Sequence, residues 1–210
     1  MSYVIVGRTG SAVGGPRGSR YRRAVPTLIH LNGPPGIGKS TLAALWAARH
    51  PRTLDLDLDQ LHPLVGGWED PEQDTHSLVR PLGKAVAATH LAGGNDVVLP
   101  QNITRLSEVE AFEAIAHAQG ADFAEVVLLD DRAAALARFD ARTDDTVWNR
   151  HNRLVVEALG GATFLGTLYD ALLEVLAQRP SAIVLRSVPG AVEETYAALE
   201  EALAGQPDQD

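Results

Sequence analysis

The chain contains no cysteine, so it can form no disulfide and offers no thiolate to a metal ion. Its seven histidines show no spacing typical of metal ligands. No apolar run approaches the ~18 residues of a membrane-spanning helix, and no apolar signal segment is evident, so we expect a soluble, cytoplasmic protein without a membrane partner. With 210 residues and 45% hydrophobic content, the chain can bury one sizeable core, which favours a single domain.

Acidic residues are absent before Asp55, whereas five arginines fall within the first 25 positions. The other 13 of the 18 basic residues face 27 acidic ones, which leaves the rest of the chain with a formal charge of −14. Such a body repels polyanions, so extended nucleic acid is disfavoured as a partner and a small molecule is favoured. We expect residues 1–25 to form a flexible basic tail, or alternatively an arm that reaches a phosphorylated partner, and residues 206–210 to be flexible as well.

A glycine-rich segment with the spacing G-x-x-x-x-G-K-S separates a β-prone run, residues 27–31, from a helix-forming run, residues 41–49. The glycines permit backbone angles that other residues resist, so successive N–H groups can close around phosphate oxygens. The helix that follows adds the positive end of its dipole. The segment consists of Gly33, Pro34, Pro35, Gly36, Ile37, Gly38, Lys39, Ser40 and Thr41.

Three side chains of this loop have predicted roles. Lys39 would place its ammonium on the β- and γ-phosphates, and the Ser40 hydroxyl would coordinate Mg²⁺. Thr41 is expected in the first helical turn or on the α-phosphate. The loop therefore predicts a nucleoside triphosphate site, with ATP and Mg²⁺ as the expected cofactors.

Residues 53–59, reading TLDLDLD, alternate apolar and acidic side chains as a strand does. The acids belong either to a solvated edge or, at the carboxyl end of the strand, to the γ-phosphate site. Residues 62–76 show no period and follow that strand directly, which is typical of a substrate loop. Trp68 is either an aromatic wall of that loop or its anchor.

Strands and helices alternate along the rest of the chain, which predicts an α/β fold with a parallel sheet covered on both faces. Ser107 and Glu110 have the spacing of a capping box at the start of one helix. Further strands are expected at 96–100, 123–129 and 182–187, and further helices at 75–92, 107–119, 131–142, 148–159, 163–178 and 192–204.

In order and spacing, four segments resemble the P-loop small-molecule kinases, a group that includes adenylate-kinase-like, gluconate-kinase-like and chloramphenicol-phosphotransferase-like enzymes. The segments are GPPGIGKS, LDLDQL, Asn102-x-x-Arg105, and the arginines Arg132, Arg138 and Arg142. The resemblance implies a three-layer P-loop NTPase fold with a five-stranded parallel sheet of order 2-3-1-4-5 and a small lid. Residues 26–205 would form this domain, with the substrate loop in 60–84 and the lid in 136–153.

The resemblance also implies roles for single residues. Asp59 matches the carboxylate that takes the proton from the acceptor hydroxyl, and Asp57 is the alternative base or a ligand of the Mg²⁺ water shell. Because alternation places both on one face, the sequence does not separate them. Arg138 and Arg142 match lid arginines that stabilise the transferring phosphoryl group. Alternatively they are surface arginines paired with Asp131, Asp140, Asp144 or Asp145.

One feature departs from the wider P-loop pattern. Many P-loop proteins end their third strand in an aspartate near Mg²⁺, whereas here the strand leads into Gln101 and Asn102, expected either at substrate or γ-phosphate or in a turn. Asp130 or Asp131 follows the fourth strand, where a helix cap is the better interpretation.

Other candidates for contacts with an acceptor are weaker. Arg80 and Lys84 are candidates for an anionic substrate group or unpaired surface charges. His62 is a candidate substrate contact, and His30 is expected in the core.

The leading hypothesis is therefore an ATP-dependent phosphotransferase that moves the γ-phosphoryl group to a hydroxyl of a small metabolite, nucleoside-like compound or antibiotic. A nucleotide-dependent switch or ATPase that acts on a protein partner is the alternative. A polynucleotide 5′-hydroxyl kinase is a third, weaker possibility.

Overall fold

The computed structural model describes residues 25–70, 72–141 and 146–205. The two terminal segments expected to be flexible, apart from Val25, lie outside the described residues. Residues 142–145 of the predicted lid region also lie outside them.

Five parallel strands form one sheet of order β2-β3-β1-β4-β5, which confirms the predicted fold class and strand order. At its centre, Ile29 of β1 is opposite Val98 of β3 on one side and Ala124 of β4 on the other. The strands are β1 (Thr27–Asn32), β2 (Leu54–Asp55), β3 (Val97–Leu99), β4 (Asp122–Leu129) and β5 (Ile183–Arg186).

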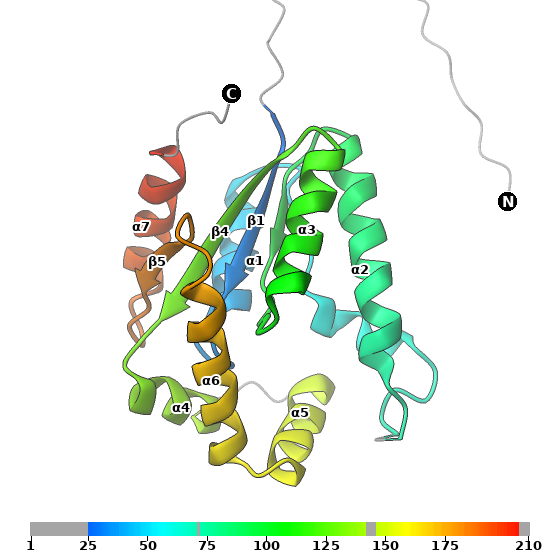
Figure 1. The fold of residues 1–210 in the computed structure, drawn as a ribbon, viewed down its shortest axis with the longest axis vertical. Coiled ribbons are helices and arrows are strands. Elements are labelled where there is room, and N and C mark those ends of the chain that lie inside the picture. The colour runs from blue at the N-terminus through cyan, green and yellow to red at the C-terminus, as the bar shows by residue number, and fades with distance from the viewer. Residues whose placement is uncertain (1–24, 71, 142–145, 206–210) are drawn as a thin grey trace, which may run out of the picture.

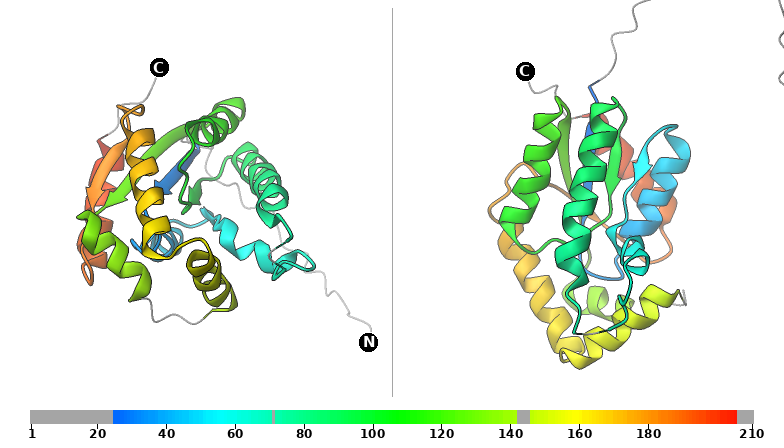
Figure 2. Two further views of the ribbon diagram at one scale, coloured as in Figure 1. Left: turned by 60° about the horizontal axis from the view of Figure 1, so that its bottom comes forward. Right: turned by 90° about the vertical axis from the view of Figure 1, so that its right-hand side faces the viewer.

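Helices cover both faces of the sheet. Helices α2, α3 and α6 lie in front of it and α1 and α7 behind it, while α4 and α5 gather below the carboxyl ends of the strands (Figure 1; Figure 2, right). No single described helix is long and apolar enough to cross a membrane, and α5 with α6 reaches that threshold only as a pair bent by 96°. The helices are α1 (Lys39–Arg49), α2 (Thr75–Ala92), α3 (Leu106–Ala118), α4 (Arg132–Asp140), α5 (Val147–Ala158), α6 (Ala162–Leu176) and α7 (Val192–Ala204).

Two hydrophobic cores lie on opposite faces of the sheet, as the alternating direction of strand side chains requires. Leu28 of β1 belongs to the core under α2 and α3, whereas Ile29 belongs to the core under α1 and α7. Tyr196 of α7 and Phe112 of α3 are almost completely buried in these two layers. Apolar burial of this extent stabilises the sheet and holds the ends of its strands in register.

Two local predictions are wrong. The strand expected at residues 53–59 ends at Asp55, and the chain turns into a 3₁₀ helix, η1 (Leu58–Gln60), because the Asp57 carboxylate accepts a hydrogen bond from the Asp59 N–H at 3.0 Å. Helix α3 begins after Arg105 and has no side-chain cap, so the proposed capping box of Ser107 is absent. A second 3₁₀ helix, η2 (His62–Leu64), follows η1.

An ion-pair cluster joins β4, α3 and the segment after α6. The Arg179 guanidinium, beyond the end of α6, donates to Glu125 of β4 at 2.7 Å and to both carboxylate oxygens of Glu113 in α3 at 2.8 and 3.1 Å. The Glu125 side chain is 2% exposed. A buried carboxylate that loses its only cation is strongly destabilising.

We therefore expect Arg179→Met to lower the free energy of unfolding by about 3 kcal/mol, measured by denaturant unfolding followed by circular dichroism. Arg49→Met is the matched control, because Arg49 pairs with Glu193 at the surface, with side chains 42% and 66% exposed. That control should change stability little. Equal effects of the two substitutions would contradict a special role for the cluster.

Candidate functional site

The predicted phosphate loop connects β1 to α1 at the carboxyl edge of the sheet. Gly36 has a φ of 85°, and a Cβ atom there would lie 2.8 Å from the Phe139 backbone nitrogen and 2.9 Å from the carbonyl carbon of Arg138. Only glycine fits this place, where helix α4 closes against the loop. Gly38, in the left-handed conformation, then starts α1, whose first N–H groups have no partner within the helix. These features suit a cradle for phosphate oxygens.

The Lys39 side chain is 8% exposed and folds back over the loop. Its ammonium donates to the carbonyl oxygens of Gly33 at 2.8 Å and Pro34 at 3.0 Å. An ammonium held at this position can exchange a carbonyl oxygen for a phosphate oxygen when a nucleotide binds. The geometry is compatible with the role predicted for Lys39.

Two asparagines attach the loop to the segment after β3. Asn32 is completely buried, its amide oxygen accepts from the N–H groups of Gly33 at 2.8 Å and Ile103 at 3.0 Å, and its amide nitrogen donates to the Ile103 carbonyl at 3.0 Å. Asn102 donates to the Gly33 carbonyl at 2.9 Å. The sequence reasoning missed Asn32, although a polar residue at the end of an apolar strand beside the loop is a usable signal.

Arg138 and Ser187 hold the opposite side of the loop. The Arg138 guanidinium donates to the Ile37 carbonyl at 2.8 Å and to the Ser187 carbonyl at 2.8 Å. The Ser187 hydroxyl also donates to the Ile37 carbonyl at 2.8 Å. Asp130, expected at a helix cap, has a carboxylate oxygen 3.9 Å from the Arg138 guanidinium. Ser187 follows β5 and had no signal in the sequence, because only folding brings it to the loop.

The structure separates the two carboxylates that the sequence could not distinguish. Ser40 lies close enough to Asp57 to act on its pKa, whereas Asp59 accepts a hydrogen bond from the Gln101 amide nitrogen at 3.4 Å. Burial and the charge of Asp59 raise the pKa of Asp57 above its usual range, and the nearby Ser40 hydroxyl counteracts this in part. Asp57 therefore lies beside Ser40, the predicted Mg²⁺ ligand, and Asp59 lies beside the segment that follows β3.

Ser40 and Asp57 together fit a Mg²⁺ ion. Hydroxyl and carboxylate oxygens are the donors that this ion prefers, and a partly buried carboxylate that is repelled by a neighbouring carboxylate gains from a divalent cation. No cluster of three or more His, Cys, Asp or Glu side chains that could hold a metal occurs in the described parts of the chain. The remaining ligands of such an ion would be phosphate oxygens and water, as is usual for Mg²⁺.

Gln101 connects the acidic side of the site to the core. Its carbonyl oxygen accepts from His30 Nε2 at 3.1 Å, so that nitrogen of the imidazole carries the proton. His30 is completely buried, as predicted for a core histidine, and burial lowers its pKa to about 4. A neutral His30 thus supports the backbone of the residue whose amide reaches Asp59.

An aromatic cluster joins the predicted substrate loop to the predicted lid region. The His62 ring stacks on Trp148 of α5 with 4.3 Å between centroids, and Trp68 meets His151 of α5 edge-on at 5.1 Å. The two segments approach each other below the strand ends (Figure 2, left). His62 is buried, and burial followed by the charge of His76 lowers its pKa to about 4. These contacts favour Trp68 as an anchor, and its contact with substrate stays a prediction.

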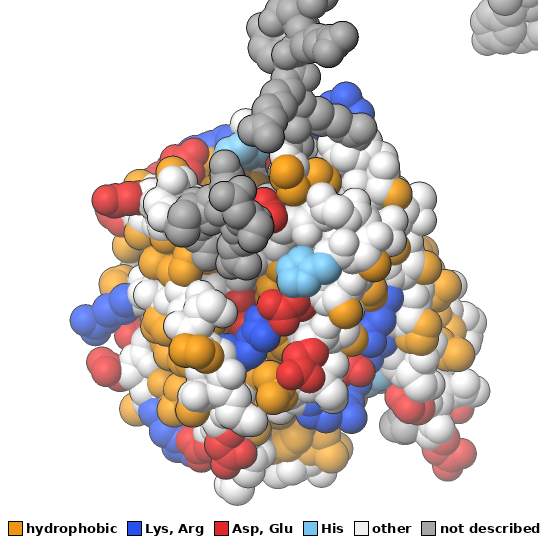
Figure 3. Space-filling view, turned by 45° about the horizontal axis from the view of Figure 1, so that its top comes forward, with side chains coloured by type: hydrophobic (Ala, Val, Ile, Leu, Met, Phe, Trp, Pro, Cys, Tyr) orange, Lys and Arg blue, Asp and Glu red, His pale blue; other side chains and the backbone are white. Residues whose placement is uncertain are grey.

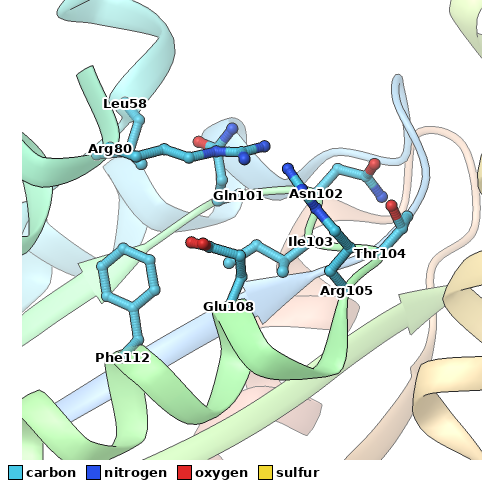
Figure 4. Close-up of a pocket in the computed structure, with 9 residues that line it drawn as sticks. All are labelled: Leu58, Arg80, Gln101, Asn102, Ile103, Thr104, Arg105, Glu108 and Phe112. Carbon is cyan, nitrogen blue, oxygen red and sulfur yellow. The ribbon is translucent and has the colours of Figure 1, made fainter. Parts of the chain in front are cut away.

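Four other residues predicted from the sequence are basic, and they lie in different surroundings. Lys84 pairs with Glu108 at 3.0 Å, so it is not the unpaired surface charge considered from the sequence. Arg80 lines a pocket with Gln101 and Asn102 (Figure 4). Arg142 lies outside the described residues, and the catalytic roles of Arg138 and Arg142 stay predictions.

Fold and site together define a protein with a P-loop kinase-like fold. The family model described as an AAA domain matches residues 28–160, so the chain belongs to that family. This match and the structural neighbours confirm the resemblance to P-loop kinases inferred from the sequence. No curated protein sequence matches the chain.

Three solved structures have a similar fold. A tunicamycin resistance protein from Deinococcus radiodurans aligns at a TM-score of 0.56 and 15% identity, over 87% of this chain and 97% of that one. A gluconokinase from Sinorhizobium meliloti 1021 aligns at a TM-score of 0.54 and 20% identity, over 87% of this chain and 98% of that one. A chain of the Pnkp1/Rnl/Hen1 RNA repair complex aligns at a TM-score of 0.55 and 15% identity, over 77% of this chain and 49% of that one. At these identities the likeness concerns the fold alone.

The position of Asp57 generates a prediction about stability. A pKa raised in the folded state means that protonated Asp57 favours folding below the unfolded carboxyl pKa of ~3.9, and that this contribution is lost as pH rises through the folded value. Asp57→Asn keeps the acceptor oxygen and removes the charge. We expect it to raise the thermal unfolding midpoint of the ligand-free protein near pH 7, with no gain below pH ~4.

In the presence of nucleotide, added Mg²⁺ should stabilise the wild type more than the Asp57→Asn variant, because the variant lacks a ligand charge for the ion. Differential scanning calorimetry measures both effects. Glu194→Gln on α7 is the control, because it removes one exposed negative charge far along the sequence from the site. A destabilised ligand-free Asp57→Asn, or an undiminished Mg²⁺ effect, would contradict the assignment.

Proposed function

We propose that this protein is an ATP-dependent phosphotransferase that moves the γ-phosphoryl group of ATP to a hydroxyl of a small molecule. The observation that carries the proposal is the division of the two carboxylates, with Asp57 beside Ser40 and Asp59 beside Gln101. A second carboxylate next to a pocket is what proton removal from an acceptor hydroxyl requires.

In the proposed reaction the loop amides and Lys39 bind the phosphates. Ser40 and Asp57 would hold a Mg²⁺ ion, which would supply positive charge to the phosphate oxygens. Asp59 orients the acceptor hydroxyl and takes its proton while the oxygen attacks the γ-phosphorus. The bond between that phosphorus and the β,γ-bridging oxygen breaks, and ADP leaves. Arg138 and Arg142 would stabilise the charge on the transferring group.

Small acceptors are favoured over polynucleotides by charge. The chain has a net formal charge of −9. On the face in Figure 3, which is turned away from the carboxyl ends of the strands, basic side chains are scattered among acidic ones. A polynucleotide groove needs a continuous basic surface. The fold is shared with part of an RNA repair complex, so polynucleotide 5′-hydroxyls belong in any acceptor panel.

The function is tested by measuring ATP turnover by the full chain alone and with a panel of small hydroxyl compounds, a 5′-hydroxyl oligonucleotide and a cell-free protein fraction. We expect a small hydroxyl compound to stimulate turnover and to yield a phosphorylated product, detected by mass spectrometry. Turnover that ignores every small acceptor but responds to protein would support the switch instead. Product on the oligonucleotide alone would support the polynucleotide kinase.

Asp59→Asn tests the proposed base. We expect nucleotide affinity, measured by calorimetry, to stay within about twofold of wild type, and the turnover number to fall by about 10² to 10⁴ because general-base assistance is lost. Asp55→Asn is the matched control, since Asp55 is the first of the three alternating aspartates Asp55, Asp57 and Asp59 and lies on β2, before the site. Its pKa is raised to about 6 by burial and by the charge of Asp57, so the change removes a carboxylate that interacts with the same group. Substantial transfer by the Asp59 variant would refute this assignment.

A further inference from the structure

A pocket beside Asp59 contains two arginines from separate elements. Arg80 extends from α2 and Arg105 precedes α3, and both guanidinium groups point toward the side of the pocket that Gln101 and Asn102 occupy (Figure 4). The pocket is further lined by Leu58, Ile103, Thr104, Glu108 and Phe112. Its polar side therefore carries more than one positive charge.

The charge of this pocket is not balanced by its own residues. Glu108 is the one acidic side chain among the lining residues, and its carboxylate is paired with Lys84 at 3.0 Å. Within the described parts of the chain, neither Arg80 nor Arg105 makes a side-chain hydrogen bond or ion pair. The pKa of His76 is lowered, first by burial and then by the positive charge of Arg80. Two unneutralised guanidinium groups in one pocket are suited to an anionic ligand.

Gln101 supplies the link between this pocket and the proposed base. Its amide nitrogen reaches the Asp59 carboxylate at 3.4 Å, while its amide oxygen is buried and has no hydrogen-bond partner. A buried acceptor without a donor is costly, so an oxygen in this state is suited to a hydroxyl on a bound molecule. In a compound with several hydroxyls, one hydroxyl could donate to Gln101 while its neighbour donates to Asp59.

Three aspartates on and between β2 and η1 would repel such a ligand unless the arginines bound it. Asp55, Asp57 and Asp59 follow one another at every second position, and they would repel an anion that approached the γ-phosphate. A ligand whose anionic group lies on Arg80 and Arg105 keeps that group at the far side of the pocket. Its uncharged hydroxyl end can then face the carboxylates.

Building on the proposed function, we infer that the phosphoryl acceptor is a small anionic hydroxy compound, a hydroxy acid or the phosphate monoester of a polyol, whose anionic group binds Arg80 and Arg105. The acceptor hydroxyl donates to Asp59 and passes its proton there as its oxygen bonds to the γ-phosphorus. Gln101 is a positioning residue that holds the Asp59 carboxylate. The anionic group takes no part in the bond changes and serves for recognition.

The test uses matched pairs of acceptors that differ in the anionic group: gluconate against glucose, and glycerol 3-phosphate against glycerol. We expect kcat/KM with ATP to be at least about tenfold higher for one of the anionic members than for its neutral partner. The two pairs distinguish a carboxylate from a phosphate as the recognised group.

Arg80→Gln and Arg105→Gln should each raise the KM for the anionic acceptor about ten- to hundredfold, the range expected for loss of a charge-assisted hydrogen bond. The KM for the neutral partner should rise much less than the KM for the anionic acceptor, because the neutral partner has no charged group for the arginines to bind. Arg49→Gln, the same change at the surface pair with Glu193, is the control for net charge. Thermal unfolding of each variant shows whether it is folded.

The outcomes separate this inference from the proposed function. Transfer that prefers the neutral partners, or anionic KM values unchanged in both variants, overturns the anionic acceptor and leaves the phosphotransferase intact. Absence of transfer to every compound overturns the phosphotransferase. In that case calorimetry of gluconate and glycerol 3-phosphate, on the full chain loaded with a non-hydrolysable ATP analogue, decides the anion site: binding that both arginine variants lose supports it, and no binding overturns it.

Discussion

The carbonyl oxygens of the phosphate loop are the constraint on which the site depends. A loop whose N–H groups are to surround an anion must have its carbonyls bound elsewhere. The Lys39 ammonium donates to the carbonyl oxygens of Gly33 and Pro34, and the Asn102 amide also donates to that of Gly33. The side chains of Arg138 and Ser187 donate to the Ile37 carbonyl oxygen. These donors come from four separate segments, so the shape of the loop depends on the whole sheet.

This arrangement connects phosphate binding to the acceptor side of the site. Asn102 binds the loop and Gln101 reaches Asp59, yet they are adjacent residues after β3. His30 and Asn32, both buried on β1, fix that short segment through the Gln101 carbonyl and the Ile103 backbone. The phosphate loop and the acceptor side of the site are therefore connected through two neighbouring residues.

Much of the fold was readable from the sequence, and the misses are local. Helices α2 and α7 were predicted with the bounds that the structure shows. Apolar residues recur at helical spacing within them, and residues that break helices flank them. The strand at residues 53–59 was predicted too long, since the alternation of Leu and Asp continues into η1, where the Asp57 carboxylate binds the Asp59 N–H and turns the chain. A pattern of alternating apolar and polar residues shows which side chains could share a face of a strand. It does not show where a side chain forms a hydrogen bond with the backbone nearby and ends the strand.

The sequence by itself determined the phosphate loop, the α/β class and the two candidate carboxylates, because these depend on spacing between near neighbours. Only the tertiary structure decided which carboxylate faces Ser40, which arginine binds the loop, and which arginines meet in a pocket. Arg138 and Ser187 are 49 residues apart, and Arg80 belongs to α2 whereas Arg105 precedes α3, so no local pattern relates the members of either pair. Such pairs are set by strand order and helix packing, which depend on burial across the whole core rather than on neighbouring residues.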